Sequence, residues 1–400
     1  MQHHPTPPTI AVTRGRFGST AGKVVEQVRA CGPARREEIA TATGLSVPTV
    51  GRTVTQLVAA RVLRERPDLA PVGAIGRPST PVEIDRDHYG VLGVHLGRRL
   101  TTVAVGDLSG RLVTHRTLPR HPAALPDLEA VARAASDLLG ASGQRAPLSL
   151  GVVAPWRDVG VEEHATAAAL AELTGLDVRS ADHVAAIAAT EFAHRRHGTP
   201  GATLYVYARD TIGFAVALDK GSAVEVSRVG SLTHFPTGAD VRCPCGRTGC
   251  LEVTSGDRAL LARARALGLG NGEDISALHR LAGPGSDGAG SGTGQAQQAR
   301  ELLAARAHYL GTVAASVRDI IAPDRVVLVG QAFTGYPPVL EHVLAGYATG
   351  SLREIPASFT RFATGIQAVS ACTVALGPID DDPFAVLPRT PQARRGSTGA

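Results

Sequence analysis

At 400 residues, with 44% hydrophobic and 19% charged residues, the chain has a globular composition and room for two or three domains, which excludes disordered and fibrous classes. Its formal net charge of +5 is uneven, because residues 14–86 contain twelve Lys or Arg against seven Asp or Glu and the remainder is balanced. The sequence has neither an apolar run of about 18 residues nor a signal-peptide pattern, so we expect a cytoplasmic protein without a membrane partner.

The N-terminal part predicts a small helical unit behind a flexible arm. Residues 1–18 are rich in Pro, His and Arg and show no periodicity, so we expect them to form the arm. Helices are predicted at about 19–31, 35–43 and 47–60, because apolar residues recur there at helical spacing and Gly-containing turns separate the segments. Ser46 is a candidate N-cap for the third helix.

Two short extended segments follow the helices, around residues 64–66 and 80–84, and the loop 72–78 joins them. Three helices followed by such a hairpin predict a winged helix-turn-helix domain over residues 19–86. The basic excess of this region fits DNA, since the release of counterions is a main source of DNA affinity. An ordinary helical hairpin with a solvated basic surface is the alternative interpretation.

The third helix is the candidate DNA-reading element. Its polar face lies opposite an apolar stripe that contains Val50, Val54 and Leu57. Arg52 has the hydrogen-bonding groups to read guanine and Gln56 those to read adenine, while Arg77 in the loop suits a narrow minor groove. The candidate DNA-binding residues are Arg36, Ser46, Thr49, Arg52, Thr53, Gln56 and Arg77.

Beyond residue 86 the pattern changes to apolar strands that alternate with helices rich in Ala and Leu. This alternation predicts an α/β fold with βαβ units around a mixed sheet, which we assign to residues 87–378. The Gly/Ser-rich tract 283–294 is expected to form a flexible loop, and residues 379–400 a disordered tail.

Three cysteines, Cys243, Cys245 and Cys250, lie within eight residues, and His234 precedes them. Three thiolates and one imidazole form a closed tetrahedral set, which is typical of structural zinc because no position remains open for a reactive water. We therefore expect one structural zinc per chain. The alternatives are a catalytic zinc, which would need a vacant position, and three unrelated buried cysteines.

These residues resemble the ROK family, which contains sugar-responsive repressors and sugar kinases. Residues 243–252 match its Cys-x-Cys-Gly-x-x-Gly-Cys-Leu-Glu motif, and His234 falls where the family has its zinc histidine. Weaker matches lie at 93–110, 181–186 and 322–330. The resemblance implies an actin-like, two-lobed fold of the ribonuclease H-like sugar-kinase type with a ligand in the cleft. A winged helix before this domain is the arrangement of the repressor branch.

The chain departs from the kinases of the family at both phosphate loops. Their Asp-x-Gly-x-Thr loop is replaced by residues 95–99, His-Leu-Gly-Arg-Arg, which lack the acid and the hydroxyl. The second loop, Asp-Thr-Ile-Gly-Phe at 210–214, lacks the glycines that let the backbone approach phosphates. We therefore expect no catalytic residues and no enzyme activity.

For the sugar pocket, the resemblance offers Asp182, His234 and Glu252 as ligand-binding residues. Ala181 and Ser231 stand where the family has an Asn and a Glu. Because each hydroxyl left unpaired in a buried site costs about 1–3 kcal/mol, two such losses argue against ordinary sugar binding. Asp182 is then expected either to bind a different ligand or to support the structure.

Taken together, the sequence predicts a transcriptional regulator, a repressor, that binds double-stranded operator DNA as a homodimer or tetramer. Its C-terminal domain would sense a small molecule, a sugar or another metabolite, or mediate oligomerisation. The alternatives are a sugar kinase with an added N-terminal domain and a regulator that answers to no effector. ATP binding would distinguish the first alternative, and the absence of ligand-induced thermal stabilisation the second.

Overall fold

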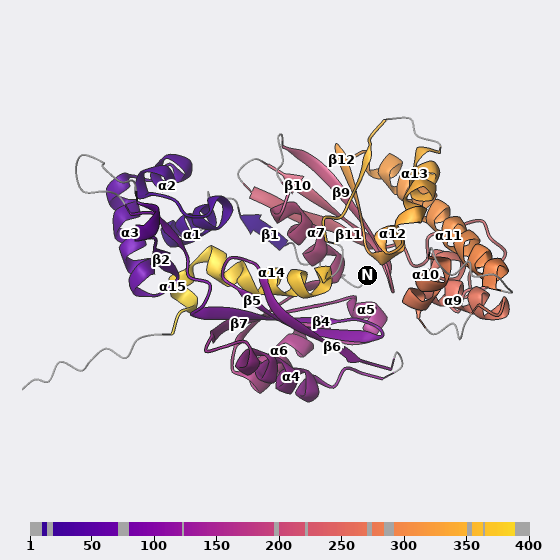
Figure 1. Ribbon diagram of the computed structural model, residues 1–400, viewed down its shortest axis with the longest axis horizontal. Helices are drawn as coiled ribbons and strands as arrows, with labels where there is room; N and C mark the ends of the chain where they lie inside the picture. The colour runs from indigo at the N-terminus through magenta and orange to yellow at the C-terminus, as the bar shows by residue number, and fades with distance from the viewer. Residues whose placement is uncertain are drawn as a thin grey trace, which may run out of the picture.

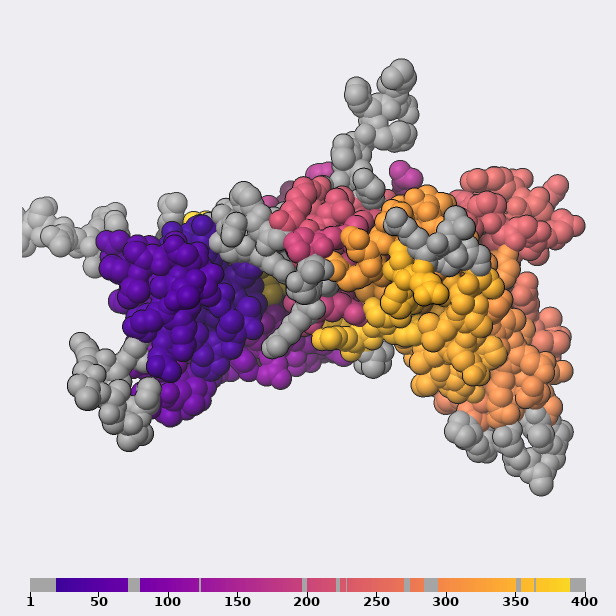
Figure 2. Space-filling view, turned by 90° about the horizontal axis from the view of Figure 1, so that it is seen from above, coloured from indigo at the N-terminus to yellow at the C-terminus, as the bar shows by residue number. Residues whose placement is uncertain are grey.

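The computed structural model describes residues 10–13, 19–70, 80–121, 124–195, 200–220, 223–269, 274–283, 292–349, 354–362 and 365–388. An N-terminal helical unit lies at one end of the molecule, and two lobes, each built on its own β-sheet, form the rest (Figure 1). Figure 2 shows the same arrangement from above, with the N-terminal unit at one end and the helices of residues 250–350 at the other. Among the described helices, none has the length and apolarity to cross a membrane.

The N-terminal unit consists of three helices and a two-stranded sheet. Its elements are α1 (Thr20–Cys31), α2 (Arg36–Thr43), α3 (Val47–Ala59), β2 (Leu63–Glu65), the short 3-10 helix η1 (Pro67–Leu69) and β3 (Val82–Ile84). Local sequence sets these boundaries: the Ser19 hydroxyl accepts from Gly22 N to cap α1, and Gly44 ends α2 in the left-handed conformation at φ 71°. The predicted helices and hairpin segments agree with these elements within two residues.

Lobe 1 is a five-stranded mixed sheet with helices on both faces. Its strands, in spatial order, are β6 (Leu112–Pro119), β5 (Leu100–Asp107), β4 (Tyr89–Leu96), β7 (Ala146–Ala154) and β8 (Asp177–Asp182). β4 pairs antiparallel with β5 and parallel with β7. The outer face packs against α4 (Leu128–Ala141) and α6 (Glu163–Thr174), and α5 (Trp156–Val159) follows β7 (Figure 1). The alternation of strands and helices predicted for this region is confirmed.

Lobe 2 is a six-stranded sheet, also covered on both faces. Its strands, in spatial order, are β1 (Ile10–Thr13), β11 (Ala223–Ser231), β10 (Ile212–Asp219), β9 (Gly201–Ala208), β12 (Arg325–Val329) and β13 (Ala357–Phe359). The face toward lobe 1 carries α7 (His183–Ala193). The other face carries α8 (Leu251–Ser255), α9 (Asp257–Ala266), α10 (Ile275–Ala282), α11 (Gly292–Ile321), α12 (Gln331–Thr334), the 3-10 helix η2 (Pro337–Val339) and α13 (Leu340–Ala348).

One helix near the C-terminus, α14 (Ile366–Asp381), joins all three parts, and α15 (Pro383–Val386) follows it. It packs on the inner face of the lobe 1 sheet and against α7 (Figure 1). The close approach requires glycine on the strands, because a Cβ on Gly151 would overlap the Ala371 carbonyl oxygen. The hydroxyl of Ser149 also donates to the Ala375 carbonyl oxygen at 2.6 Å.

The C-terminal end of α14 docks on the N-terminal unit. Ser19 N donates to the Asp381 carbonyl oxygen at 2.9 Å, and the Arg29 guanidinium pairs with Asp380 at 2.5 Å. Val24 and Val28 of α1 share one buried cluster with Ile379 of α14. The hydrophobic core therefore continues across the boundary expected at residue 86. Only the type of secondary structure changes there.

Two expectations about chain ends are wrong. Part of the expected arm, residues 10–13, forms β1, which pairs antiparallel with β11 from Ile10↔Val226 to Thr13↔Ala223. The physical reason is that the edge of β11 has unpaired backbone groups that a short apolar strand can satisfy. The expected tail beginning at residue 379 is helical as far as Asp381, because burial of Ile379 against α1 outweighs the helix-breaking tendency of Pro378.

The other two expected irregular regions are only partly described. The remainder of the arm, most of the tail from residue 389 on, and residues 284–291 of the Gly/Ser-rich tract lie outside the described residues. The end of that tract, from Gly292, belongs to α11.

The packing of α14 generates a stability prediction. Gly151→Ala should lower the free energy of unfolding by about 1–3 kcal/mol, because the new methyl group forces α14 away from β7. Gly140→Ala in α4 is the matched control, since a Cβ there meets no atom within 4 Å, and it should be neutral or slightly stabilising. Chemical denaturation measures both. Equal effects of the two substitutions would contradict this account of the docking.

Candidate functional site

The polar face of α3 is the first candidate site. Ser46 caps the helix by accepting from Thr49 N at 3.3 Å, and Pro48 lies in the first turn, where its missing N–H does no harm. Arg52 and Gln56 are exposed, while Val50, Val54 and Leu57 are fully buried on the opposite side. The helix thus presents a guanidinium and an amide to solvent from a rigidly packed support.

Thr53 does not belong to this face, contrary to the sequence prediction. It is 7% exposed and lies in the buried stripe of α3. The reason is helical geometry: positions 50, 53, 54 and 57 follow the i, i+3, i+4, i+7 spacing of a single stripe. A hydroxyl at such a position is more easily mistaken for a surface residue than an aliphatic side chain.

The remaining DNA-binding candidates lie on or near the hairpin. Arg36 of α2 donates to the Thr80 carbonyl oxygen at 3.2 Å and pairs with Glu65 at 3.0 Å, so it ties α2 to the hairpin base. Glu83 on β3 is held between Arg64 and Arg66, at 2.6 and 2.8 Å. Arg77 lies outside the described residues. The described part of the hairpin therefore has a fixed base beside α2.

The four predicted metal ligands come together. One ligand atom from each of His234, Cys243, Cys245 and Cys250 lies within 4.8 Å of the other three. The Cys245 and Cys250 sulfurs are 3.6 Å apart, and Cys243 Sγ is 3.7 Å from His234 Nδ1. A tetrahedral zinc with Zn–S bonds of about 2.3 Å has edges of about 3.8 Å, so these separations fit the ion.

The backbone around the cluster holds the ligands in place. Cys243 N donates to the Arg247 carbonyl oxygen at 2.8 Å, which closes the loop, and Gly246 and Gly249 adopt φ of 89° and 68°. Cys243 and Cys250 are buried, whereas Cys245 and His234 are exposed. A hydrogen bond from the backbone of Arg247 lowers the pKa of Cys245 to about 6, whereas burial raises the pKa of Cys250 to about 11. A bound cation would favour the thiolate at both positions.

The candidate ligand-binding residues already have partners within the fold. Asp182 caps α7 by accepting from Val184 N at 2.8 Å and Ala185 N at 3.3 Å, and burial raises its pKa to about 6. Glu252 is paired with Arg98 at 2.9 Å. His234 belongs to the metal cluster. Asp182 was expected either to bind a ligand or to support the structure. Its hydrogen bonds to the first turn of α7 favour the structural role.

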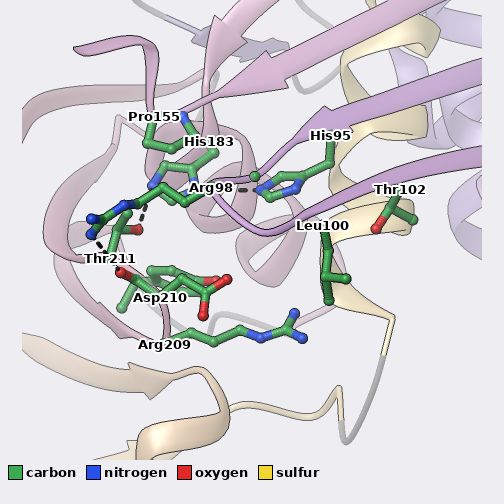
Figure 3. Close-up of a pocket in the computed structure, with 11 residues that line it drawn as sticks. His95, Arg98, Leu100, Thr102, Pro155, His183, Arg209, Asp210 and Thr211 are labelled. Atoms are coloured by element: carbon green, nitrogen blue, oxygen red, sulfur yellow. Dashed lines mark hydrogen bonds between the residues drawn. The ribbon is translucent and has the colours of Figure 1, made fainter. Parts of the chain in front are cut away.

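A small cavity lies between the lobes, where the two altered phosphate loops meet. Figure 3 shows His95 and Arg98 on one side and Arg209, Asp210 and Thr211 on the other. The cavity encloses about 20 Å³, room for little more than one water molecule. Its described lining residues do not include Asp182, His234 or Glu252.

Two neutral histidines occupy the back of this cavity. His95 Nε2 lies 3.4 Å from His183 Nδ1, and His183 Nε2 lies 3.2 Å from the Thr211 hydroxyl. Burial lowers the pKa of His183 to about 4, and burial together with repulsion from His183 holds the pKa of His95 well below its usual value. The sequence showed His95 and Arg99 as departures from the kinase loop, but it did not predict the contacts of His95, because His183 and Thr211 belong to no motif.

Known proteins that are similar to this chain belong to one family or are named transcriptional regulators. A model of the ROK family matches residues 91–364. The proteins named Transcriptional regulator Rv0485 of Mycobacterium tuberculosis and Transcriptional regulator Mb0495 of Mycobacterium bovis are each 36% identical to the chain, over 93% of this chain and 88% of theirs.

Solved structures share the fold at lower identity. A ROK family transcriptional regulator, described as a homolog of the E. coli MLC protein, has a TM-score of 0.69 at 17% identity and covers 92% of this chain and 98% of its own. The ROK hexokinase from Thermus thermophilus has a TM-score of 0.52 at 24% identity and covers 72% of this chain and 99% of its own. The ROK glucokinase from Streptomyces griseus, in complex with glucose and AMPPNP, has a TM-score of 0.54 at 17% identity, with coverages of 72% and 99%.

The buried histidines generate a pH prediction. Unfolded histidine takes up a proton near pH 6.5, whereas folded His183 resists protonation down to about pH 4. The free energy of unfolding should therefore fall as the pH decreases from about 6.5 to 4. His183→Gln should reduce that slope by up to about 1.4 kcal/mol per pH unit in denaturant titrations.

His115→Gln, at an exposed position, is the control and should keep the wild-type slope. Asp182 acts in the opposite direction, because its raised pKa favours the folded state at low pH. The difference between variants reports His183 together with its repulsion of His95. A wild-type slope in His183→Gln would show that the buried imidazole is not the source.

Proposed function

Because the chain belongs to the ROK family, we propose that it is a transcriptional regulator that binds double-stranded operator DNA through its N-terminal unit. The single observation that carries the proposal is the exposed polar face of α3, with Arg52 and Gln56 pointing away from a buried stripe and α2 packed behind it. An ordinary helical hairpin would need no guanidinium and amide on its outer face beside a two-stranded sheet.

In this proposal, the N-terminal unit is a winged helix-turn-helix over residues 19–86. α3 is the recognition helix that enters the major groove, with Ser46, Thr49, Arg52 and Gln56 facing DNA. The β2–β3 hairpin is the wing, and Arg77 in its loop is the candidate for minor-groove contact. Arg36 acts by holding the wing against α2, since its guanidinium is engaged with Thr80 and Glu65.

The two-lobed body is proposed to have no kinase activity. His95 and Arg99 stand where the related kinases have an acid and a hydroxyl, and Asp182, the position of the catalytic base, is engaged as a helix cap. Its functions in this proposal are regulation and assembly, with a sugar or another metabolite as the possible effector. Repression is the proposed sign of regulation, and an effector-independent regulator is the variant of the proposal that thermal stabilisation assays would distinguish.

We further propose that His234, Cys243, Cys245 and Cys250 hold one structural zinc. The donor set and the separations of its atoms support this assignment. With four protein ligands the ion has no open position, so it would supply stability and no reaction chemistry.

A homodimer or tetramer is proposed because a single winged helix buries too little surface for tight specific binding. Symmetric oligomers present two recognition helices to two half-sites, which predicts a pseudo-palindromic operator.

The DNA prediction is tested on fragments selected from genomic DNA by the purified protein. Arg52→Ala and Gln56→Ala should each weaken specific binding by about 1–3 kcal/mol, because each removes a bidentate contact to a base. Arg133→Ala on α4, an exposed arginine in the body, is the matched control and should leave the affinity unchanged. Fluorescence anisotropy at fixed salt measures all three. Unchanged affinity in Arg52→Ala would refute the assignment of α3.

The zinc prediction is tested by elemental analysis. Purified protein should contain about one zinc per chain, and Cys245→Ser should lose most of it and melt at a lower temperature, because metal binding is coupled to folding. Cys31→Ser changes an exposed cysteine of α1 and should keep both values. Metal content well below one per chain that does not respond to Cys245→Ser would exclude the site.

A further inference from the structure

Arg98 crosses from one lobe to the other. It lies in the turn between β4 and β5 of lobe 1, and its Nη1 donates to Glu252 of α8 at 2.9 Å and to the Asp210 carbonyl oxygen at 3.5 Å in lobe 2. The side chains of Arg98 and Glu252 are only 22% and 16% exposed. The pair is therefore a charge-assisted hydrogen bond largely withdrawn from water, which is stronger than a surface ion pair.

A second, neutral connection crosses the cleft beside this pair. His95 belongs to β4 in lobe 1, His183 begins α7, and Thr211 lies in the turn between β9 and β10 in lobe 2. Their side chains form a continuous hydrogen-bonded row, with separations of 3.4 and 3.2 Å. Opening the lobes would break this row as well as the Arg98 pair and would exchange both for hydrogen bonds with water.

The cavity beside these contacts, where the two altered phosphate loops meet, encloses about 20 Å³, whereas pockets for small molecules are about 300–1,000 Å³. The residues that the family resemblance assigns to sugar binding are not among its described lining residues, so their own contacts decide whether a sugar can bind. One of them, the carboxylate of Glu252, already accepts from a guanidinium. A neutral sugar hydroxyl is a weaker donor to a carboxylate than a cation is.

We propose that Arg98 is a built-in occupant of the interlobe cleft: it takes the place of a ligand at Glu252 and, with the His95–His183–Thr211 row, holds the lobes closed. We call this set of five residues the interlobe latch. Arg98 is thus the residue that excludes neutral sugars from the cleft, which favours a metabolite other than a neutral sugar among the two proposed kinds of effector. The proposal concerns the cleft alone and does not depend on DNA binding by the N-terminal unit.

Hydrogen exchange of the full-length protein, followed by mass spectrometry, tests the latch. In Arg98→Ala, peptides that span the β4–β5 and β9–β10 turns should exchange about tenfold faster than in the wild type, because opening no longer breaks a buried charged hydrogen bond. Glu252→Gln removes the charge from the other side and should give the same change in the same peptides, which covers the case that one variant folds poorly.

Arg209→Ala is the matched control. Arg209 lines the same cavity (Figure 3). Its charge acts on His95 and Asp210, but the side-chain hydrogen bonds and the ion pair of the latch do not involve it. Its removal should leave exchange in both turns unchanged. In a parallel thermal-shift assay, glucose at millimolar concentration should not change the melting temperature of the wild type.

Three results would overturn the proposal. The first is wild-type exchange rates in both Arg98→Ala and Glu252→Gln. The second is equal acceleration in Arg209→Ala, which would indicate a general disturbance of the cleft. The third is stabilisation of the wild type by glucose, which would show that a neutral sugar enters the closed cleft.

Discussion

The close packing of α14 against the lobe 1 sheet is the contact on which the rest of the structure depends. Glycines on β4, β5 and β7 let the helix backbone approach the strands, and buried side chains of the helix then reach α7 on the other side. The same helix ends against α1, where Ser19 and Arg29 bind its last carbonyl and carboxylate groups. Because α14 contacts the N-terminal unit and both lobes, the packing of this one helix fixes their relative positions.

The elements of the chain were largely predictable from its sequence, and their long-range partners were not. Caps such as Ser46 and stops such as Gly44 are local signals, and the helices they bound agree with the structure. The metal cluster was also predictable, because three of its ligands lie within eight residues. The strand at Ile10–Thr13 and the helical end of α14 were missed, since each is stabilised by a partner more than 200 residues away.

The interlobe cleft shows the same limit at the level of single residues. Comparison with the family motif showed that an acid is lost at His95 and a hydroxyl nearby. It could not show which contacts the new side chains make. The contacts of the altered loop depend on distances across the fold: Arg98, next to the position of the lost hydroxyl, pairs with Glu252, 154 positions along the chain, and His95 lies beside His183. The substitutions in the loop at residues 95–99, which remove the kinase motif, thus bring in side chains that make new contacts between the lobes.

The docking of α14 on α1 also has a consequence for synthesis on the ribosome. Residues 19–84 leave the ribosome early, but the helix that covers the inner side of α1 begins only at Ile366, about 280 residues later. At about 5–20 residues per second, this delay is roughly 15–60 s. During that time the side of α1 around Gly22 and Arg29 lacks its contacts with α14, so a stalled or prematurely terminated chain leaves this side of the N-terminal unit uncovered.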